Sequence, residues 1–399
     1  MDKNLRIFKL TFSPHQKQSL IFILIFGFIS LLADITYEGA RSITGAYLGV
    51  LGASATMVGF IAGFGELLGY SLRFVSGYLI DRTKRYWTIT IIGYVINLLA
   101  VPLLALTDHW LSAAIFIIAE RVGKAIRVPG RDAMLSHAAQ SVGMGLGFGI
   151  HEALDQFGAM LGPLVVAAVL YYHGSYQIAF AVLGIPAVFA LFVLVLARLQ
   201  YPNPTHLEQQ SAHFDTEGLK KIFWIYLLGS CFVGAGFADF ALIAYHFQKT
   251  NLLSPVWIPI SYALAMGINS LFSPLLGHLY DRKGFIILII VTIIAALFAP
   301  LVFLGGKILC FIGVALWSIG ISTQQSLMRA IVGNMTPKDK RASAYGIFNM
   351  SYGISWFLGS VLMGMIYDYS ILWLVIFIMV LQLISLPWFF IVIKKLYSK

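Results

Sequence analysis

The stretch Gly77-Tyr-Leu-Ile-Asp-Arg, at residues 77–82, recurs two hundred residues later as Gly277-His-Leu-Tyr-Asp-Arg, at residues 277–282. Each copy ends a long apolar run and leads into a basic turn. A second pair of segments, residues 149–162 and 346–359, aligns at nearly the same offset, with glycine at both ends of each segment. Two repeats in register indicate a chain built from two halves of common origin.

Apolar runs fill most of the chain between these motifs. The 399 residues are 59% hydrophobic and only 11% charged, whereas soluble domains contain about 25% charged residues. A membrane core about 30 Å thick needs about 20 apolar residues for each helix that crosses it. Twelve such runs predict twelve transmembrane helices, at Ser19–Gly45, Ala53–Ile80, Trp87–Leu106, Trp110–Val128, Gly143–Tyr171, Tyr176–Leu199, Ile222–Gln248, Val256–Tyr280, Phe285–Leu304, Ile308–Met335, Ala342–Tyr367 and Ile371–Ile393.

The twelve predicted helices divide into two groups of six. Residues 1–199 form the first bundle and residues 222–399 the second, and the polar segment 200–221 connects them. We therefore expect an all-α membrane protein with two pseudo-symmetric six-helix bundles. Two halves with the same orientation predict a two-fold axis along the membrane normal and a substrate site near the midplane.

The basic residues fix the predicted orientation. Lys249 and Lys307 are the basic residues of the predicted outer loops, and most of the other Lys and Arg residues lie at the opposite ends of the spans. Because cytoplasmic loops carry the excess of Lys and Arg, both termini are expected in the cytoplasm, with the chain in the cell inner (plasma) membrane. The formal charge of +10 thus follows membrane topology, and no nucleic-acid partner is expected.

The paired glycine and Asp-Arg motifs resemble the signature loop of the major facilitator superfamily. The resemblance covers nearly the whole chain and implies that this loop controls a cytoplasmic gate. The residues that would form the gate are Gly77, Asp81, Arg82, Gly277, Asp281 and Arg282. The alternative is that these residues are only a positive-inside anchor.

The fifth predicted helix carries Gly158 and Gly162, followed by Pro163. This spacing is similar to a signature of proton-driven antiporters in the same superfamily, which implies export. A Gly-x-x-x-Gly pair is also a general device for close helix packing, so plain packing remains the alternative.

Charged residues inside the predicted spans are candidates for the transport site, because a charge in the bilayer is costly unless it pairs or has a function. Asp34, Glu38 and Arg41 are spaced to share one helix face. Burial disfavours a charged carboxyl group and a neighbouring Arg favours it, so an acid in such a cluster could bind and release a proton. The predicted proton-coupling residues are Asp34, Glu66, Glu152 and Asp155. Structural ion pairs, such as Glu66 with Arg73 or Glu120 with Lys124, are the alternative.

The second half has fewer charged groups inside its spans, and its aromatic and amide side chains could shape a substrate surface. The predicted substrate cavity comprises Glu38, Arg41, Arg73, Glu120, Arg121, Asp239, Tyr245, Gln324, Asn349, Tyr352 and Trp356. For the aromatic and amide members, ordinary helix packing is the alternative.

Several classes of protein are disfavoured. The sequence has no Walker-type phosphate loop, no metal-ligand spacing and no recognisable set of nucleophile and base. We therefore expect no ATP-driven pump, no metal or cofactor and no enzyme. The expected partners are a small-molecule substrate, protons and membrane lipid, and the expected state is a monomer.

The leading hypothesis is a secondary active transporter that moves a small organic solute by alternating access, as a proton-coupled exporter. The first alternative is a proton-driven symporter that imports a metabolite or siderophore-like compound, because a fold does not fix function. The second is a non-transporting membrane sensor or lipid-handling protein.

Overall fold

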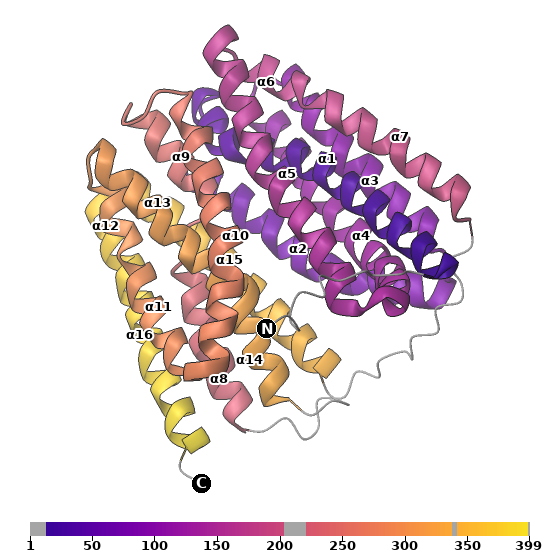
Figure 1. Ribbon diagram of the computed structural model, residues 1–399. Coiled ribbons are helices and arrows are strands. Elements are labelled where there is room, and N and C mark those ends of the chain that lie inside the picture. The colour runs from indigo at the N-terminus through magenta and orange to yellow at the C-terminus, as the bar shows by residue number, and fades with distance from the viewer. Residues whose placement is uncertain (1–12, 203–220, 337–340, 398–399) are drawn as a thin grey trace, which may run out of the picture.

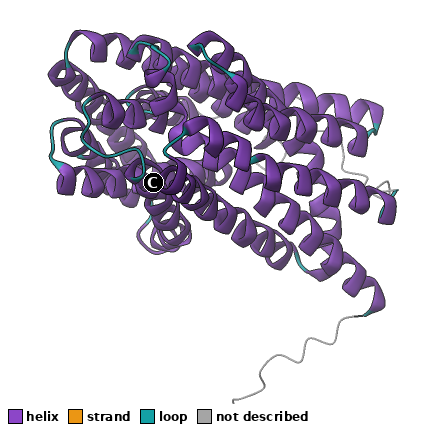
Figure 2. Ribbon diagram, turned by 90° about the horizontal axis from the view of Figure 1, so that it is seen from above, coloured by secondary structure: helices purple, strands orange, loops and turns teal. Residues whose placement is uncertain are grey.

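The computed structural model describes residues 13–202, 221–336 and 341–397, and within them every regular element is a helix (Figure 2). The first half contains α1 to α7 and one 3₁₀ turn, η1. Their bounds are Pro14–Val50 (α1), Ala55–Thr83 (α2), Tyr86–Leu103 (α3), Leu104–Leu106 (η1), Trp110–Val142 (α4), Met144–His173 (α5), Tyr176–Val182 (α6) and Gly184–Gln200 (α7).

The second half contains α8 to α16 and a π-helical segment, η2. The bounds are Lys221–Ala235 (α8), Phe240–Lys249 (α9), Trp257–Lys283 (α10), Ile286–Ala296 (α11), Phe298–Phe303 (α12), Lys307–Ser322 (α13), Thr323–Leu327 (η2), Met328–Met335 (α14), Arg341–Tyr369 (α15) and Ile371–Tyr397 (α16). Figure 1 shows the two halves side by side. The predicted connection between them lies mostly outside the described residues.

The helices begin where the sequence supplies caps. Ser13 and Gln16 form a reciprocal capping box at the start of α1, with Pro14 at the first helical position. The hydroxyl of Ser54 accepts a hydrogen bond from the Met57 amide at the start of α2. Inside a bilayer, water is absent and each backbone group must bond within the protein, so the long apolar runs fold as helices.

Eleven helical stretches among the described residues are long and apolar enough to cross a membrane. α4 supplies the twelfth crossing: it has 33 residues but carries several charged side chains. The predicted all-α fold with twelve crossings is confirmed.

Some predicted spans need correction. The fourth was predicted to end at Val128, but α4 continues to Val142, and its charged residues are buried or half-buried among neighbouring helices. The seventh span is broken between Ala235 and Phe240, and the tenth contains η2. The sixth and ninth also divide into shorter helices, and apolar composition alone gives no signal for these interruptions.

We call the side where α7 ends and α8 begins the linker side, and the other the far side. On the far side the two halves touch closely. A side chain on Gly45 of α1 would overlap the carbonyl oxygen of Ala241 in α9, and one on Gly59 of α2 would overlap that of Ser360 in α15. Glycine thus permits direct backbone contact between the halves at these positions.

One carboxylate joins the halves at the far-side end of α2. Asp368, near the end of α15, accepts hydrogen bonds from the amides of Ala55 and Thr56 at 3.1 and 2.9 Å. Its Oδ2 also accepts from the Thr56 hydroxyl at 2.7 Å. A helix of the second half therefore caps the positive N-terminus of a helix in the first half.

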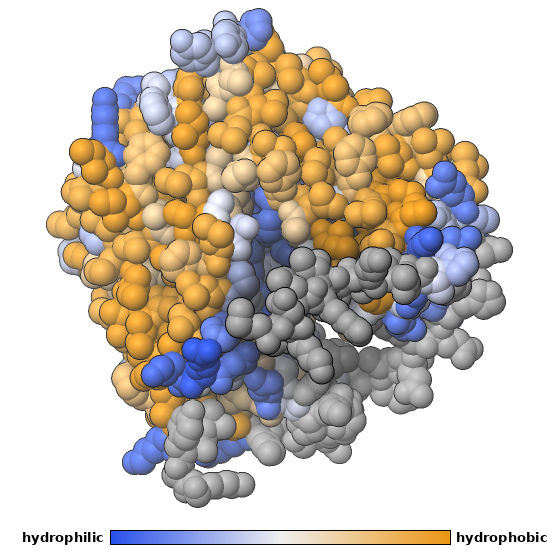
Figure 3. Space-filling model, viewed as in Figure 1, coloured by the Kyte–Doolittle hydropathy of each residue, from blue (hydrophilic) through white to orange (hydrophobic). Residues whose placement is uncertain are grey.

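The linker side is open. Asp81, Arg82, Asp281 and Arg282 are all exposed, and nothing lies within 4 Å of a side chain placed on Gly277. Figure 3 shows a hollow between the halves on this side, lined by hydrophilic residues and flanked by hydrophobic surface. The structure is thus closed on the far side and open on the linker side.

The glycine contact across the far side can be tested by enlarging it. Gly45→Leu should prevent closure on the far side, because the new side chain has no room against Ala241. A cysteine at Leu48, which is 1% exposed, would report the change in a chain without Cys231 and Cys310. We expect a maleimide to label Leu48→Cys at least tenfold faster when Gly45→Leu is present.

The matched control is Gly149→Leu in α5, where nothing lies within 4 Å of the new Cβ. It should leave the labelling rate of Leu48→Cys unchanged. Equal labelling rates of Leu48→Cys in the Gly45→Leu and Gly149→Leu proteins would contradict the assigned contact between Gly45 and Ala241.

Candidate functional site

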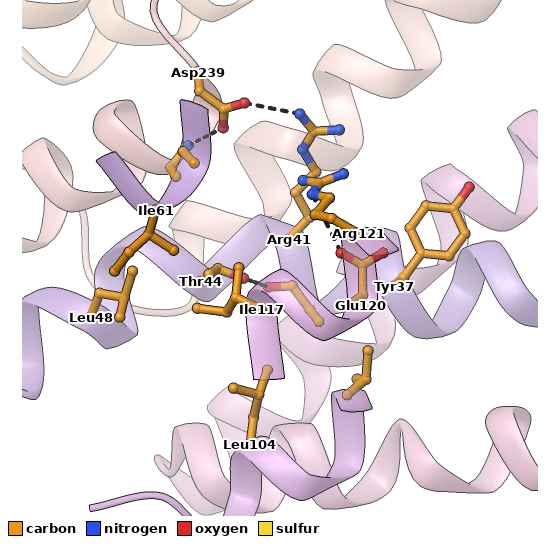
Figure 4. A pocket seen from close by; sticks show the side chains of 14 residues that line it. Tyr37, Arg41, Thr44, Leu48, Ile61, Leu104, Ile117, Glu120, Arg121 and Asp239 are labelled. Carbon is orange, nitrogen blue, oxygen red and sulfur yellow. Dashed lines mark hydrogen bonds and ion pairs between the residues drawn. The ribbon is translucent and has the colours of Figure 1, made fainter. Parts of the chain in front are cut away.

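An ion pair between the halves lies at the centre of the charged groups. Arg41 Nη2 of α1 donates to Asp239 Oδ2 at 3.0 Å (Figure 4). It also donates to Glu66 Oε1 of α2 at 3.0 Å. Arg41 and Glu66 are each 17% exposed and Asp239 is 4% exposed. Among the described residues, this is the ion pair that crosses between the halves.

The break between α8 and α9 positions Asp239. Its Oδ1 accepts from the Ala241 amide at 2.9 Å and so caps α9, which leaves Oδ2 for Arg41. Gln382 donates to the carbonyls of Val233 and Gly236 at the end of α8, at 3.2 and 2.9 Å. Because these side-chain bonds replace lost helical ones, the break is stable within the membrane.

The charged chain continues into the first half. Arg121 Nη1 lies 3.5 Å from Glu66 Oε1, and its Nε lies 3.4 Å from Glu120 Oε2. Asn97 donates to Glu120 Oε1 at 2.9 Å. Both acids are ion-paired, as the structural alternative expected, but with other partners: Glu66 pairs with Arg41 and Arg121, and Glu120 pairs with its sequence neighbour Arg121.

A small cavity of about 30 Å³ lies beside this chain, room for about one or two water molecules. Arg41, Glu120, Arg121 and Asp239 contribute to its wall together with apolar side chains of α1, α2 and α4, and their charged groups gather at one end (Figure 4).

Glu38 makes a second connection between the halves. It accepts a hydrogen bond from the hydroxyl of Tyr262 in α10 at 2.6 Å, and Lys124 Nζ lies 3.6 Å from its other oxygen. Lys124 also lies 3.8 Å from the centre of the Tyr37 ring. Glu38 is therefore shared between Lys124 in the same half and Tyr262 across the interface.

Asp34 differs from the other acids of α1. It is 3% exposed, and its Oδ1 has no hydrogen-bond partner among the described residues. Gly158 lies directly against it, since a Cβ at Gly158 would be 3.0 Å from the Cβ of Asp34. The predicted packing motif of α5 thus holds α1 at close range, and Gly162 meets the backbone of α1 at Ile35 in the same way.

The other two predicted proton-coupling residues lie on α5. Asp155 Oδ1 is 4.0 Å from Arg131 Nη1, which is a long ion pair. Glu152 is exposed, and its Oε1 accepts from the amide of Gln156 at 3.0 Å. Next to them, His151 hydrogen-bonds to Ser30 of α1 at 2.8 Å.

The predicted residues of the second half fall into two places. Gln324 lies in η2, and its amide nitrogen and oxygen are both buried without a partner among the described residues. Tyr352 and Trp356 of α15 are also buried. The Tyr352 hydroxyl and the Trp356 indole nitrogen have no hydrogen-bond partner among the described residues. Asn349 is half-buried one turn away.

Tyr245 and Arg73 lie apart from the charged chain. The Tyr245 hydroxyl accepts from Lys249 at 3.0 Å and its ring packs on Gly49, so it belongs to the far-side contact. Arg73 is half-buried, with its guanidinium carbon 5.8 Å from the centre of the Tyr70 ring.

The sequence alone did not identify Tyr262, Asn97 or Asp368. Their partners are distant in sequence, 224 residues for Tyr262 with Glu38. Asp368 offered one available signal: an acid at the C-terminal end of a helix is unfavourable unless it has a partner elsewhere.

The coupling between Arg41 and Asp239 can be measured by a double-mutant cycle. Arg41→Gln leaves Asp239 buried without a cation, which should cost about 3 kcal/mol because breaking a buried pair exposes an uncompensated charge. Asp239→Asn removes that charge but retains an oxygen that can cap α9. We expect the double variant to melt at or above the temperature of Arg41→Gln alone.

Arg198→Gln, at an exposed position of α7, is the control and should not change the melting temperature. Strictly additive losses for the two substitutions would show that the pair is not coupled.

The comparisons with known proteins agree with this architecture. A family model described as Major Facilitator Superfamily matches residues 19–360. An uncharacterized protein of Mycobacterium tuberculosis is 38% identical over 376 residues, which cover 92% of each chain. An uncharacterized MFS-type transporter of Methanocaldococcus jannaschii is 26% identical over 359 residues, covering 87% of this chain and 89% of the relative.

Solved transporters share the fold at low identity. The nucleoside transporter NupG has a TM-score of 0.74 at 15% identity and covers 95% of this chain and 100% of its own. A bacterial homolog of the human lysosomal transporter Spinster, inward-facing and unoccupied, has a TM-score of 0.72 at 14% identity, with 95% and 97% covered. The chain is a multi-pass membrane protein that belongs to the Major Facilitator Superfamily of transporters.

Proposed function

We propose that this secondary transporter exports a small cationic or zwitterionic organic solute in exchange for protons, by alternating access between its two halves. The observation that carries the proposal is the position of Asp34. This acid is buried on α1 without a hydrogen-bond partner for Oδ1, one turn from Glu38 and two from Arg41, the residues that bond across the halves.

A proton at Asp34 would have a direct effect on the interface. Burying a charged carboxylate without a hydrogen-bond donor costs more free energy than burying its neutral form. Proton binding at Asp34 would therefore lower the cost of keeping this part of α1 buried. Asp155 is the predicted acid that could share this proton, since Asp34 lies on α1 and Asp155 on α5, which pack against each other. Glu66 is a weaker candidate than predicted, because two arginines already hold its charge.

The acids that pair with a base offer a site for a cation. An ammonium group of the solute could replace Arg41 at Asp239, which would break the ion pair between the halves, or Lys124 at Glu38, the acid that also accepts from Tyr262 across the interface. The unpartnered polar atoms of Gln324, Tyr352 and Trp356 could bind the rest of the solute. The closed far side and open linker side are the arrangement expected of one state in such a cycle.

The repeated motifs would act in the opposite state. Asp81 and Arg82 and their counterparts Asp281 and Arg282 are exposed in this open arrangement, and Gly77 and Gly277 are half-buried. When the linker side closes, their glycines would allow close approach and their charges would pair across the gap. The excess of Lys and Arg on this side supports a cytoplasmic location for it and for both termini in the inner membrane.

The proposal is tested in inverted membrane vesicles that carry an imposed pH gradient, acid inside. Candidate organic cations are first selected by their ability to raise the melting temperature of the purified protein. Adding a selected cation should dissipate the gradient, because an exporter in this orientation moves the solute inward as protons leave. We expect Asp34→Asn to reduce this dissipation at least tenfold while the thermal shift by the cation persists.

Asp108→Asn, at an exposed position between η1 and α4, is the matched control and should behave as the unmodified protein. Solute and protons moving in the same direction would instead establish the symporter. If no soluble solute changes the melting temperature, the sensor or lipid-handling alternative gains and the proposal fails.

A further inference from the structure

An apolar groove runs along the outer surface where the halves meet at α5 and α10. It has a volume of about 570 Å³, within the range of about 300–1,000 Å³ usual for ligand pockets. Phe157, Leu164 and Leu264 contribute to its walls and are 50%, 40% and 43% exposed. In a membrane these side chains face hydrocarbon, so the groove fits an alkyl chain.

One amide side chain is part of the otherwise mostly apolar lining of this groove. Gln156 lines it, its Oε1 is buried without a partner in the described chain, and its Nε2 donates to Glu152 at 3.0 Å. Glu152 lies about 6 Å along α5 from Gln156. It is exposed, and the described residues supply it with no ion pair. A carboxylate without an ion-pair partner thus lies on α5 beside Ala153 and Gln156, which line the groove, and is hydrogen-bonded to Gln156.

The space-filling view adds a third observation. In Figure 3, hydrophilic residues are visible in the seam between the two halves, between hydrophobic surfaces on either side. Hydrophilic side chains are therefore exposed along this seam, where a molecule beside the protein could reach them.

We propose that the groove between α5 and α10 is a lateral access site for a single-chain amphiphile with a cationic head group. Its alkyl chain lies on Phe157, Met160 and Leu264, and its ammonium pairs with Glu152. This inference rests on the proposed function and names its substrate class: a protonated Glu152 cannot pair with the ammonium, so proton and amphiphile compete for one carboxylate.

A second groove provides an internal control. It lies between α15 and α16, has a volume of about 630 Å³, and its lining, which includes Met365, Trp373 and Phe377, contains no charged or amide side chain. Any bilayer lipid should occupy it without regard to head-group charge. A preference confined to the α5–α10 groove therefore cannot arise from partitioning into the membrane.

The test uses three probes with the same diazirine-bearing octadecyl chain and different heads: ammonium, alcohol and carboxylate. The protein is reconstituted in phosphatidylcholine nanodiscs and irradiated, and labelled peptides are quantified by mass spectrometry. We expect the ammonium probe to label the α5–α10 groove at least fivefold more than either other probe. The α15–α16 groove should be labelled equally by all three.

Two variants separate the head from the chain. Glu152→Gln should lower the ammonium preference to about one without reducing labelling by the alcohol probe. Gly267→Leu places a side chain in the groove, where only Met160 lies within 4 Å of its Cβ, and should reduce labelling by every probe there. Unchanged labelling of the α15–α16 groove verifies that each variant is folded. If Glu152→Gln does not fold, Gln156→Ala, which removes the side chain that donates to Glu152, replaces it.

Equal labelling of the α5–α10 groove by all three heads would identify ordinary boundary lipid and overturn the proposal. A preference that survives in Glu152→Gln would also overturn it, because the carboxylate would not be the determinant. Neither readout uses a proton gradient. Absence of the labelling preference together with intact proton exchange would reject the access site alone. A labelling preference without proton exchange would reject proton coupling alone.

Discussion

The contact between Arg41 and Asp239 is the interaction on which this arrangement depends. It requires Asp239 to stand at the break between α8 and α9, with one oxygen capping α9 and the other free for Arg41. It also requires α1 and α9 to approach until their backbones touch at Gly45. A buried ion pair adds little net stability because both charges lose water, but breaking it is expensive. The pair is therefore suited to select one arrangement of the halves over others.

The two halves contribute different chemistry to the space between them. The first half holds the chain of acids and bases that extends from Glu66 through Arg121 to Glu120. The second contributes Asp239 and Tyr262, together with buried polar atoms that have no partner in the described structure, on Gln324 and Trp356. Most of the charge around this space thus comes from the first half, and the second half contributes mainly neutral hydrogen-bonding groups besides Asp239.

Local patterns in the sequence predicted the crossings and much of the charged site. Asp34, Glu38 and Arg41 follow helical spacing, and α1 turns all three toward the interior, where each is largely buried. Partners could not be predicted, because Tyr262 and Asp239 reach Glu38 and Arg41 across about two hundred residues. The break before Asp239 could not be predicted because the apolar run continues through it. The predicted end of the fourth span was too early because the charges of α4 resemble those at the end of a span.

The composition of α4 has a consequence for how the protein enters the membrane. Glu120, Arg121, Lys124, Arg127 and Arg131 lie along this helix, and each charge at a helix centre costs about 2.5–3.5 kcal/mol on insertion. Asn97 of α3 bonds to Glu120, and the Arg127 guanidinium lies 4.4 Å from the Tyr94 ring centre. A helix with this composition cannot partition into lipid alone. Its integration during synthesis must wait for α1 to α3, so biogenesis of the first half is cooperative.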